Sequence, residues 1–118
     1  MAELRQPPAI EAFGRGGFRI EGHRHEGPVL ILADQVTDWS GEGTAESVAA
    51  VLAAPRADVE FLILGTGARL QPPPAALREA LRLAGLGLEV LTTAEAARLY
   101  NLLARDGRRV AAALRPVE

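Results

Sequence analysis

The stretch of the chain that most constrains its fold runs from Val59 to Pro74. A mostly apolar run, Val59–Leu64, ends in Gly65-Thr66-Gly67, and the stretch closes with three prolines after Arg69. A short apolar run is typical of a strand buried on both faces of a parallel sheet. Glycines permit a tight turn, and Pro74 suits the start of a helix. The stretch therefore predicts a strand, a turn and a helix in succession.

The same alternation of strand and helix recurs along the chain. Two further apolar runs predict strands, Pro28–Ala33 and Leu88–Leu91. Helices are predicted from the N-cap Thr44 to Ala54, from Pro74 to Ala84, and from the Thr92-Thr93-Ala94-Glu95 capping box to Gly107. Alternating strands and helices indicate an α/β fold with βαβ crossovers and a largely parallel sheet.

The two ends of the chain are predicted to differ from this middle part. Residues 1–7 read as a loose arm, and Pro8–Gly14 with Phe18–Glu26 read as a β-hairpin around a glycine-rich turn. Arg108–Val117 alternates in character, which favours a half-exposed or edge strand. The buried central strands are then expected at 29–32, 61–64 and 88–90. At 118 residues the chain is expected to be one domain.

Composition excludes several kinds of chemistry. All thirteen basic residues are arginine, and the chain has no lysine and no cysteine. A Schiff-base amine, a thiolate nucleophile, a disulfide and a cysteine-held metal cluster are thus impossible, and no cofactor is expected. A net charge of −2 gives no reason to expect nucleic acid as a partner. No apolar run approaches the roughly 20 residues that span a bilayer, so a soluble, cytoplasmic protein without membrane insertion is expected.

The chain resembles the Mth-like domain family of unknown function, which includes a mitochondrial complex I assembly factor and an adipogenesis-associated protein. The motifs that carry the resemblance extend over nearly the whole chain: Gly16-Gly17-Phe18, Trp39, Leu64-Gly65-Thr66-Gly67 with Arg69, Thr92-Thr93, Tyr100-Asn101 and Gly107-Arg108-Arg109-Val110. The resemblance implies a three-layer α/β fold with a mixed central sheet and an antiparallel last strand. It implies no established enzymatic activity and supplies no catalytic residues.

A candidate site is expected at the carboxyl ends of the strands, where open α/β sheets bind ligands. Gly65, Thr66, Gly67, Thr92 and Thr93 should meet there. The start of the third helix could receive a small anion, and a tethered arginine at position 69 could pair with it. The dinucleotide fingerprint fails, because leucine stands at position 70 where a third glycine would be. The alternative is that the glycines simply turn the chain.

Three further features have both a functional and a structural interpretation. Asn101 is a poor interior helix residue, so it is expected to bond either a neighbouring backbone or a ligand. Trp39 covers the core, or serves as a binding anchor if it is exposed. Glu21, His23 and His25 could share one face of a strand and hold zinc, but a polar hairpin surface has the same pattern. No metal site is expected.

The resemblance implies a non-enzymatic interaction or assembly protein with a protein partner, and the residues add only that most common catalytic groups are missing or badly placed. The alternative is an enzyme that binds a small molecule or an anion at the strand ends, and a homo-oligomer also remains open. An exposed apolar patch around Trp39 would favour the first interpretation. A closed polar pocket with Arg69 pointing inward would favour the second.

Overall fold

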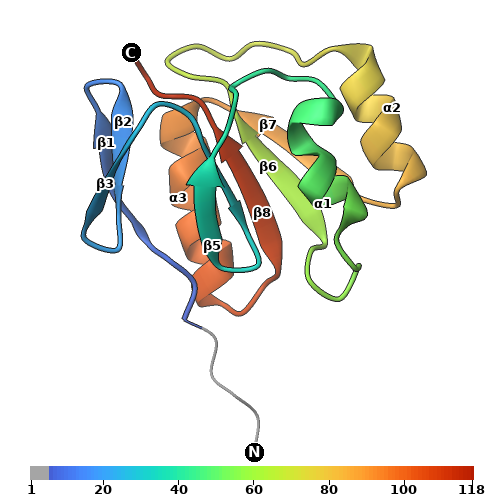
Figure 1. Ribbon diagram of the computed structural model, residues 1–118, viewed down its shortest axis with the longest axis horizontal. Helices are drawn as coiled ribbons and strands as arrows, with labels where there is room; N and C mark the ends of the chain where they lie inside the picture. Colours follow the sequence, from blue (N-terminus) through green and yellow to red (C-terminus); the bar gives the residue numbers. More distant parts are fainter. Residues whose placement is uncertain (1–5) are drawn as a thin grey trace, which may run out of the picture.

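The computed structural model describes residues 6–118 and has a five-stranded mixed sheet at its centre (Figure 1). In spatial order the strands are β5, β4, β8, β6 and β7. Their bounds are β4 Val29–Leu32, β5 Gln35–Asp38, β6 Phe61–Gly65, β7 Gly87–Leu91 and β8 Val110–Leu114. The last strand of the chain therefore lies in the middle of the sheet.

Only β4 runs against the other strands. It pairs antiparallel with β5 and with β8, whereas β6 pairs parallel with β7 and with β8. The antiparallel pairing expected of the last strand is thus found on its β4 side, and its β6 side is parallel. The four strands that share a direction end at the same edge, which brings the loops after β6, β7 and β8 together.

Helices and a second small sheet cover the two faces of the central sheet (Figure 1). One face carries a 3₁₀ turn at Glu46–Val48, α1 at Ala49–Ala53 and α2 at Ala75–Leu83. The other carries α3 at Thr93–Arg105 and a three-stranded antiparallel sheet of β1 Ile10–Gly14, β2 Gly17–Ile20 and β3 His23–Glu26. The three-layer α/β fold expected from the sequence is confirmed.

Each face of the central sheet has its own core. Ile63 and Ala112 face a cluster with Phe18, Ile20 and Tyr100, under α3 and the small sheet. The residues on either side of Ile63 in β6 and of Ala112 in β8 face the opposite cluster, under α1 and α2. This cluster contains Leu62, Leu64, Ala111, Ala113, Trp39, Val51, Leu77 and Leu81. Burial on both faces explains why β6 and β8 have nearly continuous apolar sequences.

Two strand positions expected from the sequence are wrong. The last strand was expected at an edge, but β8 lies between β4 and β6 and all five of its residues are buried. Residues 88–90 were expected to be central, but β7 is an edge strand with exposed or half-buried side chains. The alanines of β8 gave a weak hydrophobic signal although small side chains suit a strand between two close layers. Glu89 interrupts β7 and is exposed, as an edge permits.

The hairpins add two strands that the sequence analysis does not predict. Residues 18–26 form two strands rather than one, and residues 35–38 form strand β5. Three two-residue turns with positive φ at both positions reverse the chain: Arg15-Gly16, Glu21-Gly22 and Ala33-Asp34. Such turns match the twist of paired strands, and glycine or asparagine favours them. Ala33-Asp34 lacks both, so its hairpin gave no clear signal.

The helices follow the sequence more closely. The Thr92 hydroxyl accepts a hydrogen bond from Glu95 N at 3.4 Å, which confirms the capping interaction. Residues 44–54 form a 3₁₀ turn and a short helix instead of one continuous helix. Pro55 follows immediately and prevents a longer helix. Of the arm expected at residues 1–7, residues 1–5 lie outside the described part of the chain.

Ala33→Gly should raise the free energy of unfolding by about 0.5–1 kcal/mol. Ala33 has φ of 50°. An L-residue in this region costs about 1–2 kcal/mol, which exceeds the entropic cost of glycine. Denaturant unfolding measures the change. The matched control is Ala76→Gly in α2, which should lower stability by a similar amount. A loss of stability in both variants would contradict the strain at Ala33.

Candidate functional site

The structure brings Gly65-Thr66-Gly67 and Thr92-Thr93 together at the carboxyl ends of the strands, as expected, and these residues are called the strand-end cluster below. The buried Thr93 hydroxyl donates to Arg115 O at 2.6 Å and accepts from Gly67 N at 2.9 Å. Thr93 N donates in turn to Gly67 O at 2.9 Å. One side chain thus joins the loop after β6, the start of α3 and the end of β8.

Thr66 closes the loop after β6 on itself. Its hydroxyl donates to Arg69 O at 2.7 Å and accepts from Gln71 N at 3.2 Å. Its backbone N–H donates to Leu91 O at 2.9 Å, which continues the pairing with β7. The threonine therefore fixes the loop through hydrogen bonds within the chain.

Glycine is required at positions 65 and 67 of the cluster for two different structural reasons. A Cβ on Gly65 would lie 2.8 Å from Leu114 Cδ2 and 3.0 Å from Thr93 Oγ1, so glycine permits the close approach of α3 to the sheet. Gly67 has φ of 102°, in the region that favours glycine. Both residues are therefore explained by the turn and the packing.

The start of α3 uses its first N–H groups inside the chain. Thr93 N bonds Gly67 O, and Glu95 N bonds the Thr92 hydroxyl. These are two of the donors that an anion at a helix N-terminus would use. Among residues 6–118, the chain's own oxygens thus already accept from both of them.

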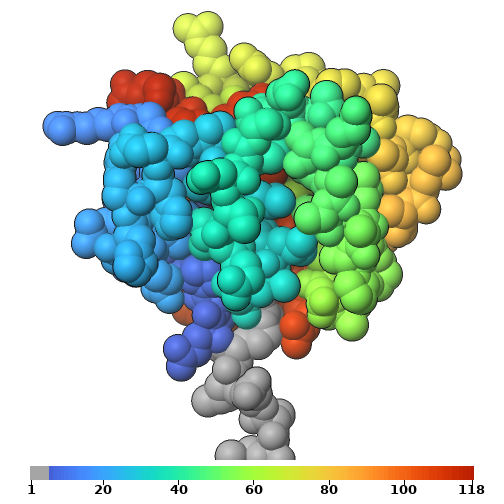
Figure 2. All heavy atoms as spheres, viewed as in Figure 1, coloured from blue at the N-terminus to red at the C-terminus, as the bar shows by residue number. Residues whose placement is uncertain are grey.

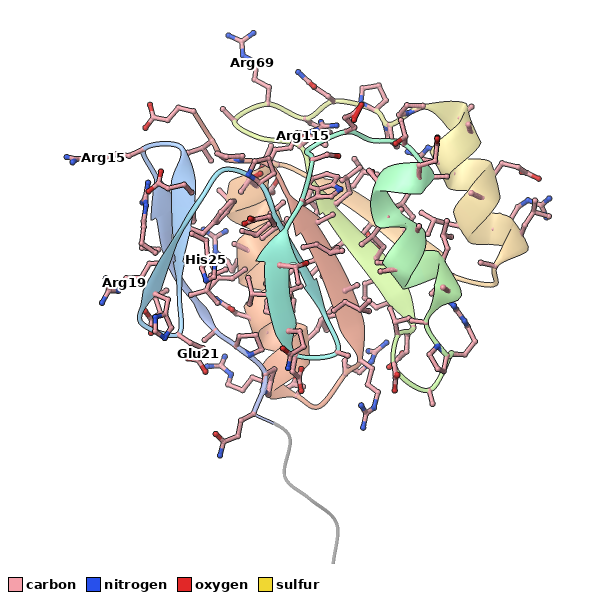
Figure 3. The ribbon with its side chains drawn as sticks, in the orientation of Figure 1. Arg15, Arg19, Glu21, His25, Arg69 and Arg115 are labelled. Atoms are coloured by element: carbon pink, nitrogen blue, oxygen red, sulfur yellow. The ribbon has the colours of Figure 1, made fainter. Side chains whose placement is uncertain are left out.

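Arg69 lies at this end of the molecule but points away from the cluster into solvent (Figure 3). Figure 2 shows its loop as a projection on the same edge. The expectation that its guanidinium is tethered is wrong, since the side chain is exposed and no hydrogen bond or ion pair to it is found within the described residues. The Thr66 hydroxyl holds the Arg69 carbonyl instead, which leaves the side chain outside.

Arg115, which the sequence analysis missed, is the arginine that lies over the strand ends. Its Nε donates to Gly41 O at 2.7 Å, and its guanidinium lies 6.0 Å from the centroid of the Trp39 ring. Trp39 is 6% exposed and belongs to the core, so it covers the core rather than serving as an exposed binding anchor. Its buried Nε1 finds no acceptor within the described residues. The only signal for Arg115 was its place directly after the last apolar strand.

Asn101 bonds a backbone, as one of its two interpretations expected. Its Oδ1 accepts from Ile10 N at 2.9 Å, and its Nδ2 donates to Ile10 O at 2.8 Å. The carboxamide thereby replaces a neighbouring strand at the free edge of β1. It lies on the opposite flank of α3 from the contacts to β7 and joins the small sheet to the helix.

The candidate metal ligands do not come together, and the carboxylates with shifted pKa values lie outside the strand-end cluster. Glu21 lies in the turn between β2 and β3, so it is not aligned with His23 and His25, and residues 6–118 contain no group of three or more side chains that could hold a metal. The pKa of Glu60 is lowered by its hydrogen bond with Arg108, and that of Glu26 by Arg24. Both pairs are exposed surface ion pairs.

This geometry defines a three-layer α/β domain whose strand ends are closed by its own hydroxyl groups. The chain belongs to the family described as "Protein of unknown function (DUF498/DUF598)", whose model matches residues 10–115. An uncharacterised Rhodobacter capsulatus protein is 41% identical over 108 residues, which are 92% of this chain and 84% of that protein. NADH dehydrogenase [ubiquinone] 1 alpha subcomplex assembly factor 3 of Homo sapiens is 30% identical over 97% of this chain, which spans 64% of its length.

Solved structures support the same assignment. A structure described as an outer membrane protein from Bartonella henselae is 31% identical, with a TM-score of 0.86, over 95% of this chain and 97% of that chain. The Rpa2829 protein of Rhodopseudomonas palustris is 38% identical, with a TM-score of 0.77, over 96% of this chain and 88% of that chain. Within residues 6–118, no helix has the length and apolarity needed to cross a bilayer.

Thr93→Val should lower the free energy of unfolding by about 2–4 kcal/mol. The change keeps the shape of the side chain but leaves Gly67 N–H and Arg115 C=O without their partner, and each buried unpaired group costs about 1–3 kcal/mol. The matched control is Thr37→Val in β5, an exposed residue whose hydroxyl makes one long hydrogen bond, to Leu30 O at 3.4 Å, and it should change stability by less than about 0.5 kcal/mol. Equal effects of both changes, measured by denaturant unfolding, would contradict the role of Thr93.

Proposed function

We propose that the chain is a non-enzymatic protein-binding factor that assists the assembly of a larger complex. The observation that carries the proposal is its similarity to relatives whose names describe assembly factors. Those from Homo sapiens, Mus musculus and Danio rerio are 30%, 31% and 34% identical over 97%, 98% and 91% of this chain. The matched region is the domain itself, so the proposal assigns the binding of the partner to this domain.

The contacts at the strand ends agree with this proposal. The hydroxyls of Thr66 and Thr93 make hydrogen bonds that hold loops together, and the Asn101 carboxamide holds β1. What the cluster turns outward is the tip of the loop after β6, where Arg69 is exposed and Leu70 is 62% exposed. An exposed arginine beside an exposed leucine suits contact with a protein better than enclosure of a small molecule.

The complex that we propose for this role is a respiratory NADH dehydrogenase. Deletion of the gene in the source organism should lower the amount of assembled enzyme severalfold and leave the transcripts of its subunits unchanged. Native gel electrophoresis with an in-gel activity stain measures the assembled complex, and a plasmid copy of the gene should restore it. An unchanged amount of complex in the deletion strain would count against this function.

Arg69→Ala should impair the same rescue while changing the free energy of unfolding by less than about 0.5 kcal/mol, as exposed substitutions usually do. The expected cause is the loss of an outward cation at the proposed contact. The matched control is Arg78→Ala, an exposed arginine in α2, which should rescue fully. If Arg69→Ala rescues as well as the control, or if it unfolds the protein, the loop tip is not the contact.

A further inference from the structure

Helix α3 buries Tyr100 but leaves its leucines at the margin of the core or outside it. Its buried residues are mostly small: Thr93, Ala96, Ala97, Tyr100 and Ala104. Its three leucines are less buried, since Leu99 and Leu103 are half-buried and Leu102 is 48% exposed. The small residues let α3 approach the sheet closely, because a Cβ on Gly65 would lie only 3.2 Å from Ala96 Cβ.

The exposed leucines belong to a regular stripe along α3. Glu95, Leu99, Leu102 and Asp106 follow one another at spacings of four, three and four residues. This is the spacing of a helix seam that packs against a second helix. Two leucines form the middle of the stripe, and a carboxylate stands at each end.

The stripe borders a hollow beside the edge strand β7. A hollow of about 340 Å³ is lined by Leu91, Glu95, Arg98, Leu99 and Leu102. β7 pairs with β6 alone, and its Leu88 and Val90 pack on the opposite face, under α1 and α2. The α3 side of β7 therefore carries only Leu91, the exposed Glu89 and Gly87. On this face of the sheet, α3 is the last helix of residues 6–118 before the edge, and it leaves β7 partly uncovered.

We propose that this groove, formed by the α3 stripe and the α3 side of β7, binds an amphipathic helix of a partner protein. The partner helix would place an apolar stripe against Leu99 and Leu102 and lie over Leu91. Packed helices lie about 8–10 Å apart, so a helix beside α3 would cover the uncovered part of β7. The proposal rests on the proposed function and adds a second contact surface, separate from the loop tip at Arg69, and the chemistry of the partner that it binds.

The charges around the groove specify a basic partner helix. Glu89 on the floor, with Glu95 and Asp106 at the two ends of the stripe, are carboxylates on the groove side. Arg98 lines the hollow too, between the groove and the flank toward β1, and Arg105 lies on that flank beside the chain before β1, so three carboxylates stand against one arginine at the groove. Lysine or arginine on both sides of the partner's apolar stripe would meet these carboxylates.

The same charges disfavour a second copy of this chain as the occupant. If two α3 helices pack antiparallel about the Leu99–Leu102 centre, Glu95 of each copy faces Asp106 of the other. If they pack parallel, Glu95 faces Glu95. Like charges in register oppose both arrangements.

The first test selects the partner's chemistry directly. A phage-displayed library of random peptides long enough for four helical turns is selected on the immobilised full chain and counter-selected on Leu102→Asp. Enriched peptides should show apolar residues at spacings of three and four with an excess of lysine and arginine. Peptides that alternate like strands, acidic peptides, or no enrichment would overturn the proposal.

The second step measures affinity with the strongest selected peptide by fluorescence anisotropy. Leu102→Asp should weaken binding about tenfold or more. The matched control Leu83→Asp, at a 72% exposed leucine of α2, should leave it unchanged. Glu89→Lys with Asp106→Lys should also weaken it, with circular dichroism showing a folded protein. A dimer in sedimentation equilibrium that Leu102→Asp dissociates would overturn the proposal in favour of self-association.

Rescue of the deletion strain distinguishes a failure of the groove proposal from a failure of the proposed assembly function. Leu102→Asp should fail to restore the assembled complex, and Leu83→Asp should restore it. Full rescue by Leu102→Asp, in a strain where deletion does reduce the complex, would overturn the groove and leave the assembly role intact. No effect of the deletion itself would overturn the assembly role, while the peptide selection would still decide whether the groove binds a basic helix.

Discussion

The close contact between α3 and β6 at Thr93 is the constraint on which the rest of the structure depends. The Thr93 hydroxyl bonds two backbone groups from different segments, and glycine at position 65 leaves the space for it. The contact brings the start of α3 close to the sheet, where the buried helix residues are Thr93, Ala96 and Ala97, and the larger Tyr100 is buried one turn further on. It also ties the last strand to the loop after β6, because Arg115 N donates to Gly65 O at 3.0 Å. Three segments far apart in sequence thereby share one junction.

The N-terminal sheet depends on a second junction on the same helix. It lies on the α3 face of the central sheet, where Phe18 and Ile20 enter the core. Asn101 holds the first residue of β1 through both its backbone groups. Side-chain amides can satisfy an open strand edge in this way, and a buried amide without such partners would be costly. This explains why a residue with low helix propensity occupies the middle of α3.

The sequence predicts the fold class well because the strongest signals are local. The apolar runs of β4 and β6, the capping box of α3 and the prolines before α2 each predict their element without tertiary information. Strand order is not local. VAAAL and GLEVL are equally long, and VAAAL has fewer large apolar side chains, yet VAAAL is the central strand and all five of its residues are buried. The hairpin at Ala33-Asp34 is hard to predict because alanine is not a usual choice for positive φ and no glycine accompanies the aspartate.

For the candidate site, the sequence predicts which segments meet but not which way their side chains point. The carboxyl ends of parallel strands must converge, so the meeting of Gly65-Thr66-Gly67 with Thr92-Thr93 follows from topology. Whether a hydroxyl faces a ligand or a neighbouring carbonyl depends on loop closure, and here Thr66 holds the Arg69 carbonyl and leaves the guanidinium outside. Close packing has a further consequence for the surface. Leu99 and Leu103 lie at the margin of the core beneath α3 and Leu102 is exposed, beside an edge strand whose α3 side no helix of residues 6–118 covers. The same junction that fixes the core therefore leaves the apolar groove open at the surface.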